Sequence, residues 1–484
     1  MDSDLIPSEP RSSADAIVAT AERWRRQLAG DLHEQVVEAL YRRAAHLADR
    51  AVSRPGQAAR PTLDRTIDRL VTSRVWGFPI MILLFAGMFW LTISGANIPS
   101  GLLASLLVDT AHPWLRGIFD DFSAPWWLTG VAVDGMYLAT AWVVSVMLPP
   151  MAIFFPLLTL LEDFGYLPRI AFNLDRLFKQ AGAHGKQAMT TMMGFGCNAA
   201  GVLAARIIDS PRERLLAILT NNFALCNGRW PMQFLIATVF IGTLAPAPLA
   251  GLVAAAAVTC VALLGVFLTL LVGWALSRTV LQGEVSTFSL ELPPYRPPRV
   301  WQALYTSLID RTLFVLWRAV VFALPAGAVI WLSANIQMGG SSVAAHCVRL
   351  FDPLGLLMGL NGVILFAYVI AIPANEIVIP TVLMLTVTMT GASGVGGGAG
   401  VLFELESSQA IRELLNAGGW TLLTGVNLML FSLLHNPCST TLYTIYKETG
   451  SVKWTLVSAA LPLALGFLVT FLVATIWRLG TGSP

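Results

Sequence analysis

Long apolar stretches set the first constraint on this chain. Seven stretches carry almost no charge, and each approaches, matches or doubles the roughly 20 residues that a helix needs to cross a bilayer's hydrocarbon core. They cover residues 75–95, 128–161, 235–275, 313–334, 362–390, 420–434 and 454–477. We therefore predict an all-α, polytopic membrane protein with eight to ten membrane-embedded helical segments.

The few charged residues are placed unevenly. Only 12% of the 484 residues are charged, against about 25% in a typical soluble domain. Residues 1–74 hold 12 Arg and 11 Asp or Glu, which leaves 37 charges for the other 410 residues. This distribution excludes a soluble enzyme, a disordered chain and a nucleic-acid-binding protein with a large basic face. Five cysteines without close-spaced pairs also exclude a disulfide framework.

Basic segments suggest how the chain is divided. Apolar residues recur every three or four positions between Ile17 and Leu47, which predicts a long amphipathic helix that ends before Pro55-Gly56, and a second short helix starts after Pro61. The first 60 residues lack the apolar run of a cleaved signal. Arg-rich residues 1–74, and five Arg between 278 and 318, favour the cytoplasm. We predict a cytoplasmic amphipathic segment, a first membrane half, a cytoplasmic linker and a second membrane half, at residues 1–74, 75–277, 278–311 and 312–484.

Polar and sulfur side chains gather where the apolar stretches are interrupted. Lipid offers no hydrogen-bond partners, so a helix can break at membrane depth only where protein or a water-filled cavity satisfies the freed backbone groups. In each half, an acidic interruption is followed by interruptions that contain cysteine. They are Pro149-Pro150 and Pro156 before Glu162-Asp163, Gly196-Cys197-Asn198, Cys226-Asn227-Gly228, Pro373-Ala374-Asn375-Glu376 and His435-Asn436-Pro437-Cys438. Paired discontinuities mark midplane binding sites in many transporters, so we predict two gate regions with broken or re-entrant helices.

The residue types at these interruptions suggest a metal site. A thiolate is a soft ligand that favours Fe2+, Mn2+ or Zn2+ over Mg2+ or Ca2+, and carboxylate and amide oxygens add harder donors. A carboxylate at the centre of a span costs roughly 2.5–3.5 kcal/mol on insertion scales, so it is seldom placed there without a use. The candidate metal ligands are Cys197, Cys226, Cys438, Glu376, Glu162, Asp163, Asn198 and Asn375.

Each candidate also has a structural interpretation. A cysteine can fill a tight turn as a small apolar residue, and a carboxylate at a span end is an ordinary helix-end charge. His435, close to Cys438, is a weaker candidate ligand because a lone histidine next to a turn more often makes a structural hydrogen bond.

Five motifs, in order along the chain, resemble the membrane module of the FeoB-type ferrous iron transporters. They are LEDFGY at residues 161–166, AFNLDR at 171–176, GFGCN at 194–198, ELPPYR at 291–296 and KETGSVKW at 447–454. The likeness runs from about residue 63 to the last apolar stretch. It implies inward transport of Fe2+ across the bacterial cytoplasmic (inner) membrane, through two gate regions with cysteines near the path. The charge distribution above already predicts a cytoplasmic N-terminus.

The resemblance also implies cofactors and partners. Fe2+ is then a transported substrate, and we expect no permanently bound cofactor and no catalytic residue. Family members usually begin with a GTPase domain, whereas this sequence has no GxxxxGK[ST] motif. Besides the lipid bilayer, the candidate partners are a separately encoded GTPase, a small FeoA-like protein and further copies of the chain in a homo-oligomer.

Three other functions fit the same features. Ligand preferences overlap among divalent metals, so the substrate could equally be Mn2+ or another divalent ion. The broken-helix gates also resemble those of nucleoside-type carriers, which would bind an organic solute and not depend on the cysteines. A membrane scaffold or sensor could keep this fold without conducting anything.

Overall fold

The computed structural model describes residues 17–18, 20, 32–51, 63–73, 75–283, 299–391, 402–403 and 408–482. The ELPPYR motif and Pro55-Gly56 lie outside these residues. The chain divides into two compact units. The first comprises Met1–Thr66 with Ser286–Glu291, and the second comprises Ile67–Val285 with Leu292–Pro484. In the first unit the described residues form α2 (Leu32–Ala51), within the predicted amphipathic helix.

Within the described residues, five continuous helical spans are long and apolar enough to cross a membrane. They are built from α4 (Gly77–Ala104), η1 (Ser105–Ala111) and α5 (His112–Asp121); α6 (Trp126–Thr129), η2 (Gly130–Tyr137) and α7 (Leu138–Asp163); α13 (Ala247–Arg278); α14 (Val300–Thr306), η7 (Ser307–Leu313) and α15 (Phe314–Asn335); and α22 (Val452–Thr481). The prediction of an all-α polytopic membrane protein is confirmed.

Two further apolar segments are sharply bent, which confirms the prediction of broken or re-entrant helices. The axes of α16 (Val343–Leu357) and α17 (Gly362–Ile370) meet at 115°, and those of the segments 409–417 and 422–449 meet at 103°. Both bends use the same local chemistry. Gly359 and Gly419 adopt positive φ angles that favour glycine, and Asn361 and Thr421 then cap the next helix with side-chain oxygens.

The remaining helices are shorter and fill the space between the spans. In the first half they are α8 (Tyr166–Gln180), α9 (Gln187–Gly196), α10 (Asn198–Ala204), η3 (Ala205–Ile207), α11 (Pro211–Thr220), η4 (Asn221–Phe223), α12 (Trp230–Ile236), η5 (Ala237–Ile241) and η6 (Gly242–Leu244). In the second half they are η8 (Asn375–Ile377), α18 (Val378–Thr390), α19 (Ser408–Ala417), α20 (Leu422–Leu434) and α21 (Ser439–Thr449). A short hairpin pairs β1 (Gln337–Met338) with β2 (Ser341–Ser342). Preceding α4, α3 (Leu63–Val71) matches the predicted second short helix.

Small residues let the two halves pack closely. A Cβ atom on Gly135 would lie 2.8 Å from the Gly327 carbonyl oxygen, and one on Gly130 would overlap the Trp331 ring. Glycines at such contacts allow apolar helices to approach backbone to backbone, which strengthens van der Waals packing in a membrane. This contact joins η2 in the first half to α15 in the second.

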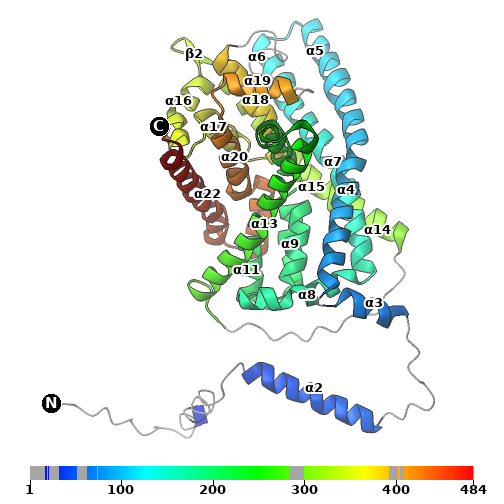
Figure 1. Cartoon of the computed structure of the whole chain (residues 1–484). Coiled ribbons are helices and arrows are strands. Elements are labelled where there is room, and N and C mark those ends of the chain that lie inside the picture. Colours follow the sequence, from blue (N-terminus) through cyan, green and yellow to red (C-terminus); the bar gives the residue numbers. More distant parts are fainter. Residues whose placement is uncertain are drawn as a thin grey trace, which may run out of the picture. The chain divides into compact units, whose positions relative to one another are not determined.

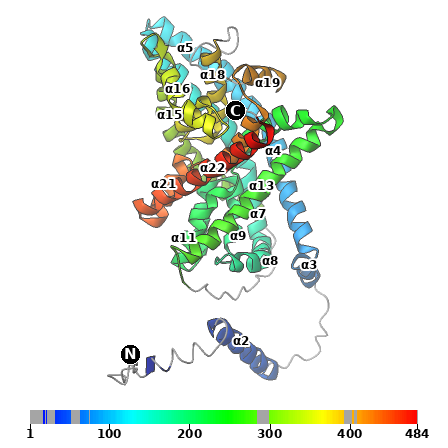
Figure 2. The same cartoon turned by 60° about the vertical axis from the view of Figure 1, so that its left-hand side comes forward.

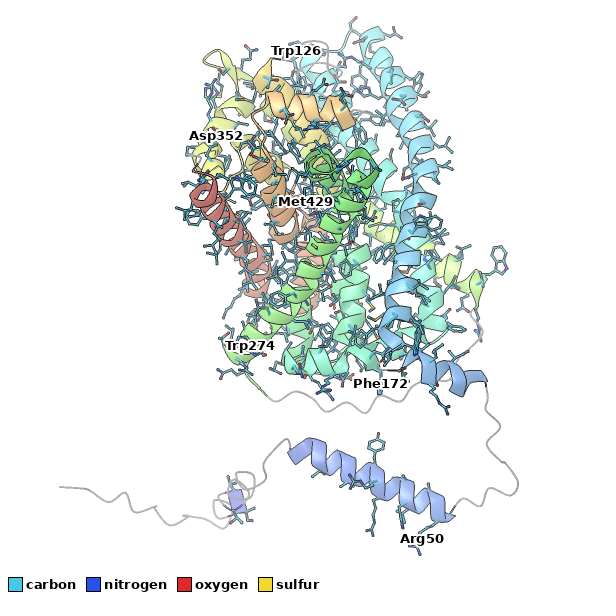
Figure 3. All side chains as sticks on the ribbon, viewed as in Figure 1. Arg50, Trp126, Phe172, Trp274, Asp352 and Met429 are labelled. Carbon is cyan, nitrogen blue, oxygen red and sulfur yellow. The ribbon has the colours of Figure 1, made fainter. Side chains whose placement is uncertain are left out.

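The second unit has two distinct ends. Figure 1 shows α8 and α11 at one end and α5, α16 and α19 at the other, and Figure 2 keeps this arrangement after rotation. In Figure 3, Phe172 and Trp274 lie toward the first end, Trp126 and Asp352 toward the second, and Met429 between them. We call these the α8 end and the α5 end.

Candidate metal centre

A helix break of a single residue places Cys197. The last residue of α9 is Gly196 and the first of α10 is Asn198, and Cys197 between them is extended, with φ −153° and ψ 121°. Glycine is required at 196 because a Cβ atom there would overlap the Phe154 ring. The amide of Cys197 still donates to Met193 and its carbonyl still accepts from Gly201, so the break leaves neither group unsatisfied.

The second break lies between η4 and α12 and carries Cys226. The amide of Asn227 donates to the Gly196 carbonyl over 3.1 Å, which ties this segment to the first break. A Cβ atom on Gly228 would meet the carboxylate of Glu376. Glycine at 228 therefore lets Glu376, from the second half of the chain, approach the backbone beside Cys226.

The third and fourth breaks lie in the second half. Ala374, which precedes η8, has φ −151° and ψ 123°, nearly the same conformation as Cys197. The fourth break follows α20, where residues 435–438 lead to Cys438 at the N-cap of α21. The amide of Ser439 donates to the Ile372 carbonyl over 2.9 Å, which joins the third and fourth breaks.

Among the described residues, one cavity is lined by side chains from all four breaks. It has a volume of about 30 Å³. Six of the eight candidate ligands line it: Cys197, Cys226, Cys438, Glu376, Asn198 and Asn375. Sequence reasoning missed other lining residues, namely Asn227, Thr440, Thr441, Met147 and Met151. Asn227 stands in the Cys226-Asn227-Gly228 interruption but is not among the eight candidates, whereas the two methionines of α7 carry no signal in the sequence.

A buried hydrogen-bond network holds the breaks together. Arg229 is only 1% exposed, and its guanidinium donates to the backbone carbonyls of Asn222, Leu433 and His435 and to the side-chain oxygen of Asn222. Two of these carbonyls lie where α20 ends. The arginine therefore satisfies backbone groups that the fourth break leaves without helical partners.

His435 supports this network and does not line the cavity. Its Nδ1 lies 2.8 Å from the Ser432 carbonyl oxygen, and its Nε2 lies 3.0 Å from the amide oxygen of Asn375. The Asn375 nitrogen lies 3.7 Å from the sulfur of Cys226. The structure therefore gives His435 hydrogen-bonding partners at both nitrogens and places it behind the cavity wall.

One of the three sulfurs lies at a helix N-terminus. Cys438 caps the eleven-residue helix α21, and a helix N-terminus stabilises negative charge through its unpaired amides and dipole. Thr441 Oγ1 also lies 3.2 Å from the Cys438 sulfur. A cation that binds between thiolates and the Glu376 carboxylate would meet negative charge that this helix helps to hold.

The remaining two candidates, Glu162 and Asp163, are exposed side chains at the end of α7. The predicted acidic interruption at residues 149–156 is wrong, because α7 continues through Pro149, Pro150 and Pro156. Buried neighbours can compensate a proline in a membrane helix, so the helix does not have to stop there. Glu162 lines a second, larger cavity of about 500 Å³ on the α8 side of the first.

In this arrangement the donors line a cavity without forming a closed cage. Throughout the described residues, no group of three His, Cys, Asp or Glu side chains is close enough to hold a metal ion together. A cation in the cavity would therefore be bound by fewer charged side chains at a time, with amide, hydroxyl or water oxygens completing its shell.

Two protein-family models match the chain. A family described as "Nucleoside recognition" matches residues 144–242 and 316–452, and one described as "Ferrous iron transport protein B C terminus" matches residues 258–310. All four breaks fall within the first match. No solved structure shows a significant match to the chain.

Relatives with similar sequences are named as iron transporters. The Fe(2+) transporter FeoB of Synechocystis is 30% identical over 87% of this chain and 64% of its own length, and that of Staphylococcus aureus strain COL is 28% identical over 84% and 58%. A Fe(2+) transport protein A/Fe(2+) transporter FeoB fusion protein of Porphyromonas gingivalis is 27% identical over 87% and 52%. The chain thus spans between about half and two thirds of the length of these relatives.

Proposed function

The chain belongs to the FeoB family of iron transport proteins, and on this premise we propose that it carries Fe2+ across a membrane through the cavity lined by Cys197, Cys226, Cys438 and Glu376. The observation that supports this proposal is that these side chains, from four separate helix breaks, line one cavity. Chance would not often gather three cysteines and a carboxylate at four such interruptions.

The donor set suits a borderline metal ion. Thiolates select Fe2+, Mn2+ or Zn2+ over Mg2+ and Ca2+, and the Glu376, Asn198 and Asn375 oxygens replace part of the water shell. Binding by thiolates releases protons, so metal affinity should rise with pH. The absence of a three-ligand cage within the described residues is compatible with transport, which needs sites weak enough to release the ion.

The size of the cavity favours an ion over an organic solute. A volume of about 30 Å³ exceeds the roughly 10–15 Å³ that one water molecule needs, but drug-sized ligands occupy about 300–1,000 Å³. The family description "Nucleoside recognition" makes a nucleoside carrier the second candidate. That function would require the breaks to separate widely before a nucleoside could enter.

The charge distribution supports a cytoplasmic α8 end. Among the described residues, α8 and α11 at this end carry Arg169, Arg176, Lys179, Arg212 and Arg214, whereas α5, α16 and α19 at the other end carry Arg116, Arg349 and Arg412. Cytoplasmic loops of membrane proteins are enriched in Lys and Arg. We therefore place the α8 end and the N-terminal segment in the cytoplasm of a bacterial inner membrane.

Transport in this direction needs no bound nucleotide. An ion with two charges gains about 4.6 kcal/mol on moving inward across 100 mV, which corresponds to about three decades of accumulation. A separate GTPase or a FeoA-like protein would then regulate a gate rather than supply the driving force. One relative is named as a fusion of Fe(2+) transport protein A with Fe(2+) transporter FeoB, which supports a FeoA-like partner. We also propose that copies of the chain assemble into a homo-oligomer.

Flux into proteoliposomes tests the proposal. The purified chain would be reconstituted without oxygen, and 55Fe2+ uptake measured with and without an inside-negative potential, in competition with Mn2+, Zn2+ or a nucleoside. We expect potential-driven uptake that Mn2+ and Zn2+ inhibit and the nucleoside does not. Inhibition by the nucleoside alone would support the second candidate, and metal binding without flux would indicate a scaffold or sensor.

A further inference from the structure

The larger cavity adjoins the candidate metal centre on its α8 side. Both cavities are lined by α10, α15 and α21, and Val315 lines both. Along α21, Thr441 lines the first cavity while Thr444 and Glu448 line the second. These positions lie about 4.5 Å and 10 Å further along the helix axis. Exposed side chains in its lining, Glu162, Arg206 and Lys447, show that the larger cavity reaches the protein surface. We call this larger cavity the vestibule.

The vestibule is unexpectedly cationic for the exit of a metal ion. Its charged lining residues are Arg206, Arg318, Lys447, Glu162 and Glu448. Arg206 and Glu448 form a two-pronged ion pair at 2.7 and 2.8 Å, which cancels both charges. Arg318 and Lys447 have no carboxylate within salt-bridge distance among the described residues. A bare divalent cation on this path would meet the positive charges of Arg318 and Lys447.

Arg318 is held in a fixed orientation. Its guanidinium carbon lies 4.0 Å from the centroid of the Phe314 ring and 5.1 Å from that of Tyr443, and its Nη1 donates to Thr444 Oγ1 over 3.2 Å. Stacking on aromatic rings keeps the planar fork of donors ordered, and such a fork matches the geometry of a carboxylate or phosphate. An ordered arginine without an anion, facing a cavity, is suited to bind one.

Lys447 adds a second positive charge beside the same ring. Its ammonium nitrogen lies 5.2 Å from the Tyr443 centroid. The Arg318 and Lys447 charges are therefore within about 10 Å of each other, roughly the screening length at moderate ionic strength. Their mutual repulsion is relieved when an anion with two or more charges lies within reach of both. The volume of about 500 Å³ lies in the range that small ligands occupy.

We propose that this vestibule binds a small oxyanion chelator of the polycarboxylate class, held by Arg318 and Lys447, which accepts the metal from the cysteine-lined cavity. The transfer is a ligand exchange. Bonds from the metal to thiolate sulfur break as bonds to carboxylate oxygen form, the metal stays in the +2 state, and each freed thiolate takes a proton from water. The bound acceptor would offset the positive charges that otherwise oppose exit. Only this transfer step rests on the proposed function.

Equilibrium binding of citrate to the purified full-length chain provides the first test. We expect wild type to bind citrate, and Arg318→Gln and Lys447→Gln each to weaken binding by about tenfold or more, because each removes a charge-assisted contact. Arg176→Gln is the matched control, since Arg176 is an exposed arginine of α8 outside the vestibule. Arg318→Lys keeps the charge and tests whether the planar fork is needed. Equal citrate binding by all variants, or none by wild type, would overturn the proposal.

Flux separates this inference from the proposed function. We expect citrate inside proteoliposomes to accelerate 55Fe2+ entry through wild type more than through Lys447→Gln, whereas a neutral chelator such as bipyridyl should act on both equally. Iron flux without citrate binding would refute the acceptor site and leave the transporter intact. Citrate binding without iron flux would support the anion site and refute the proposed transport function. Two further outcomes would also overturn the acceptor site. One is iron flux that is faster through Lys447→Gln than through wild type although neither binds citrate, and the other is that the vestibule binds anionic lipid but no citrate.

Discussion

The breaks at Cys197 and Ala374 use the same backbone device in the two halves of the chain. Each break has an extended residue directly before the next helix, and the φ and ψ angles of these two residues agree within 2°. The first break consists of Cys197 alone, whereas residues 371–374 separate α17 from η8. In each case an asparagine follows, and both asparagines line the same cavity. The difference is in the side chain at the extended position, which is a thiol in the first break and a methyl group in the second.

This difference shows that the backbone conformation of a break does not depend on a metal-binding side chain at the extended position. The backbone of a break needs a small residue and a close neighbour that satisfies the freed groups, which both positions have. A soft ligand needs sulfur, which only Cys197 supplies. The second half contributes its sulfur from the next break, at Cys438, and its carboxylate from Glu376.

The largest effect should come from removing Arg229, which ties the first half to the fourth break. Arg229→Leu would leave the carbonyls of Asn222 and Leu433 without this donor, and the His435 carbonyl would keep only the Asn222 side-chain amide. Unsatisfied buried groups cost about 1–3 kcal/mol each, and breaking a buried charged network about 3–5 kcal/mol. We expect little folded protein in detergent, as measured by size exclusion and thermal unfolding. Folding like that of wild type would show that the breaks are independent of each other.

A matched pair of glycine substitutions tests which neighbours are rigid. Gly196→Ala would push a methyl group into the Phe154 ring, which stacks on Phe89 with centroids 5.8 Å apart and cannot easily yield. We expect a loss of about 1–3 kcal/mol in stability, typical of overpacking. Gly228→Ala meets only the flexible end of Glu376, so it should alter metal flux more than thermal stability. Equal effects of the two variants on unfolding would contradict this distinction.

Making the two breaks alike tests the role of sulfur directly. Cys197→Ala gives the first break the side chain of the second. Because Ala374 already adopts this backbone conformation, we expect the fold to be retained while metal affinity falls about tenfold, the lower range for losing a metal-site interaction. Cys260→Ala is the control, since Cys260 is exposed on α13 and outside the cavity. Cd2+ binding, followed by sulfur-to-metal charge-transfer absorption, measures the effect, and an unchanged affinity would exclude Cys197 as a ligand.

The sequence predicts the cysteine-bearing breaks, but the proline-bearing break that it predicts in α7 does not form. Glycine, asparagine and cysteine within an apolar run have no use in an ordinary span, so Cys197, Cys226 and Cys438 could be found without a structure. Prolines are ambiguous, because packing against neighbouring helices decides whether α7 continues through Pro149 and Pro156. Glu162 therefore became a candidate through a break that does not form. Which side chains share a cavity depends on contacts more than 100 residues apart, such as that of Cys226 with Asn375.

The smallest effect should be a difference in pH sensitivity between the helices that precede the two breaks. At the start of α9, His184 Nδ1 accepts a hydrogen bond from the Lys186 amide over 2.9 Å. At the start of α17, the corresponding acceptor is the Asn361 side-chain oxygen, which bonds the Ile364 amide over 3.0 Å and does not titrate in this range. Burial lowers the pKa of His184 below its ordinary value of 6.5.

As the pH falls, the local stability of α9 should therefore decrease before that of α17. The unfolded state takes up a proton at His184 near pH 6.5, whereas the folded state resists it until a lower pH. The contribution of His184 to stability is therefore present above the unfolded pKa and is lost as the pH falls from that value toward the folded one. Protonation also removes the acceptor for the Lys186 amide.

Hydrogen exchange at pH 7.5 and 5.5, corrected for the intrinsic rate, should show a loss of protection in α9 that is absent in α17. His184→Asn keeps a side-chain acceptor that does not titrate, and it should abolish the difference. A difference that persists in this variant would mean that another group makes the first break sensitive to acid.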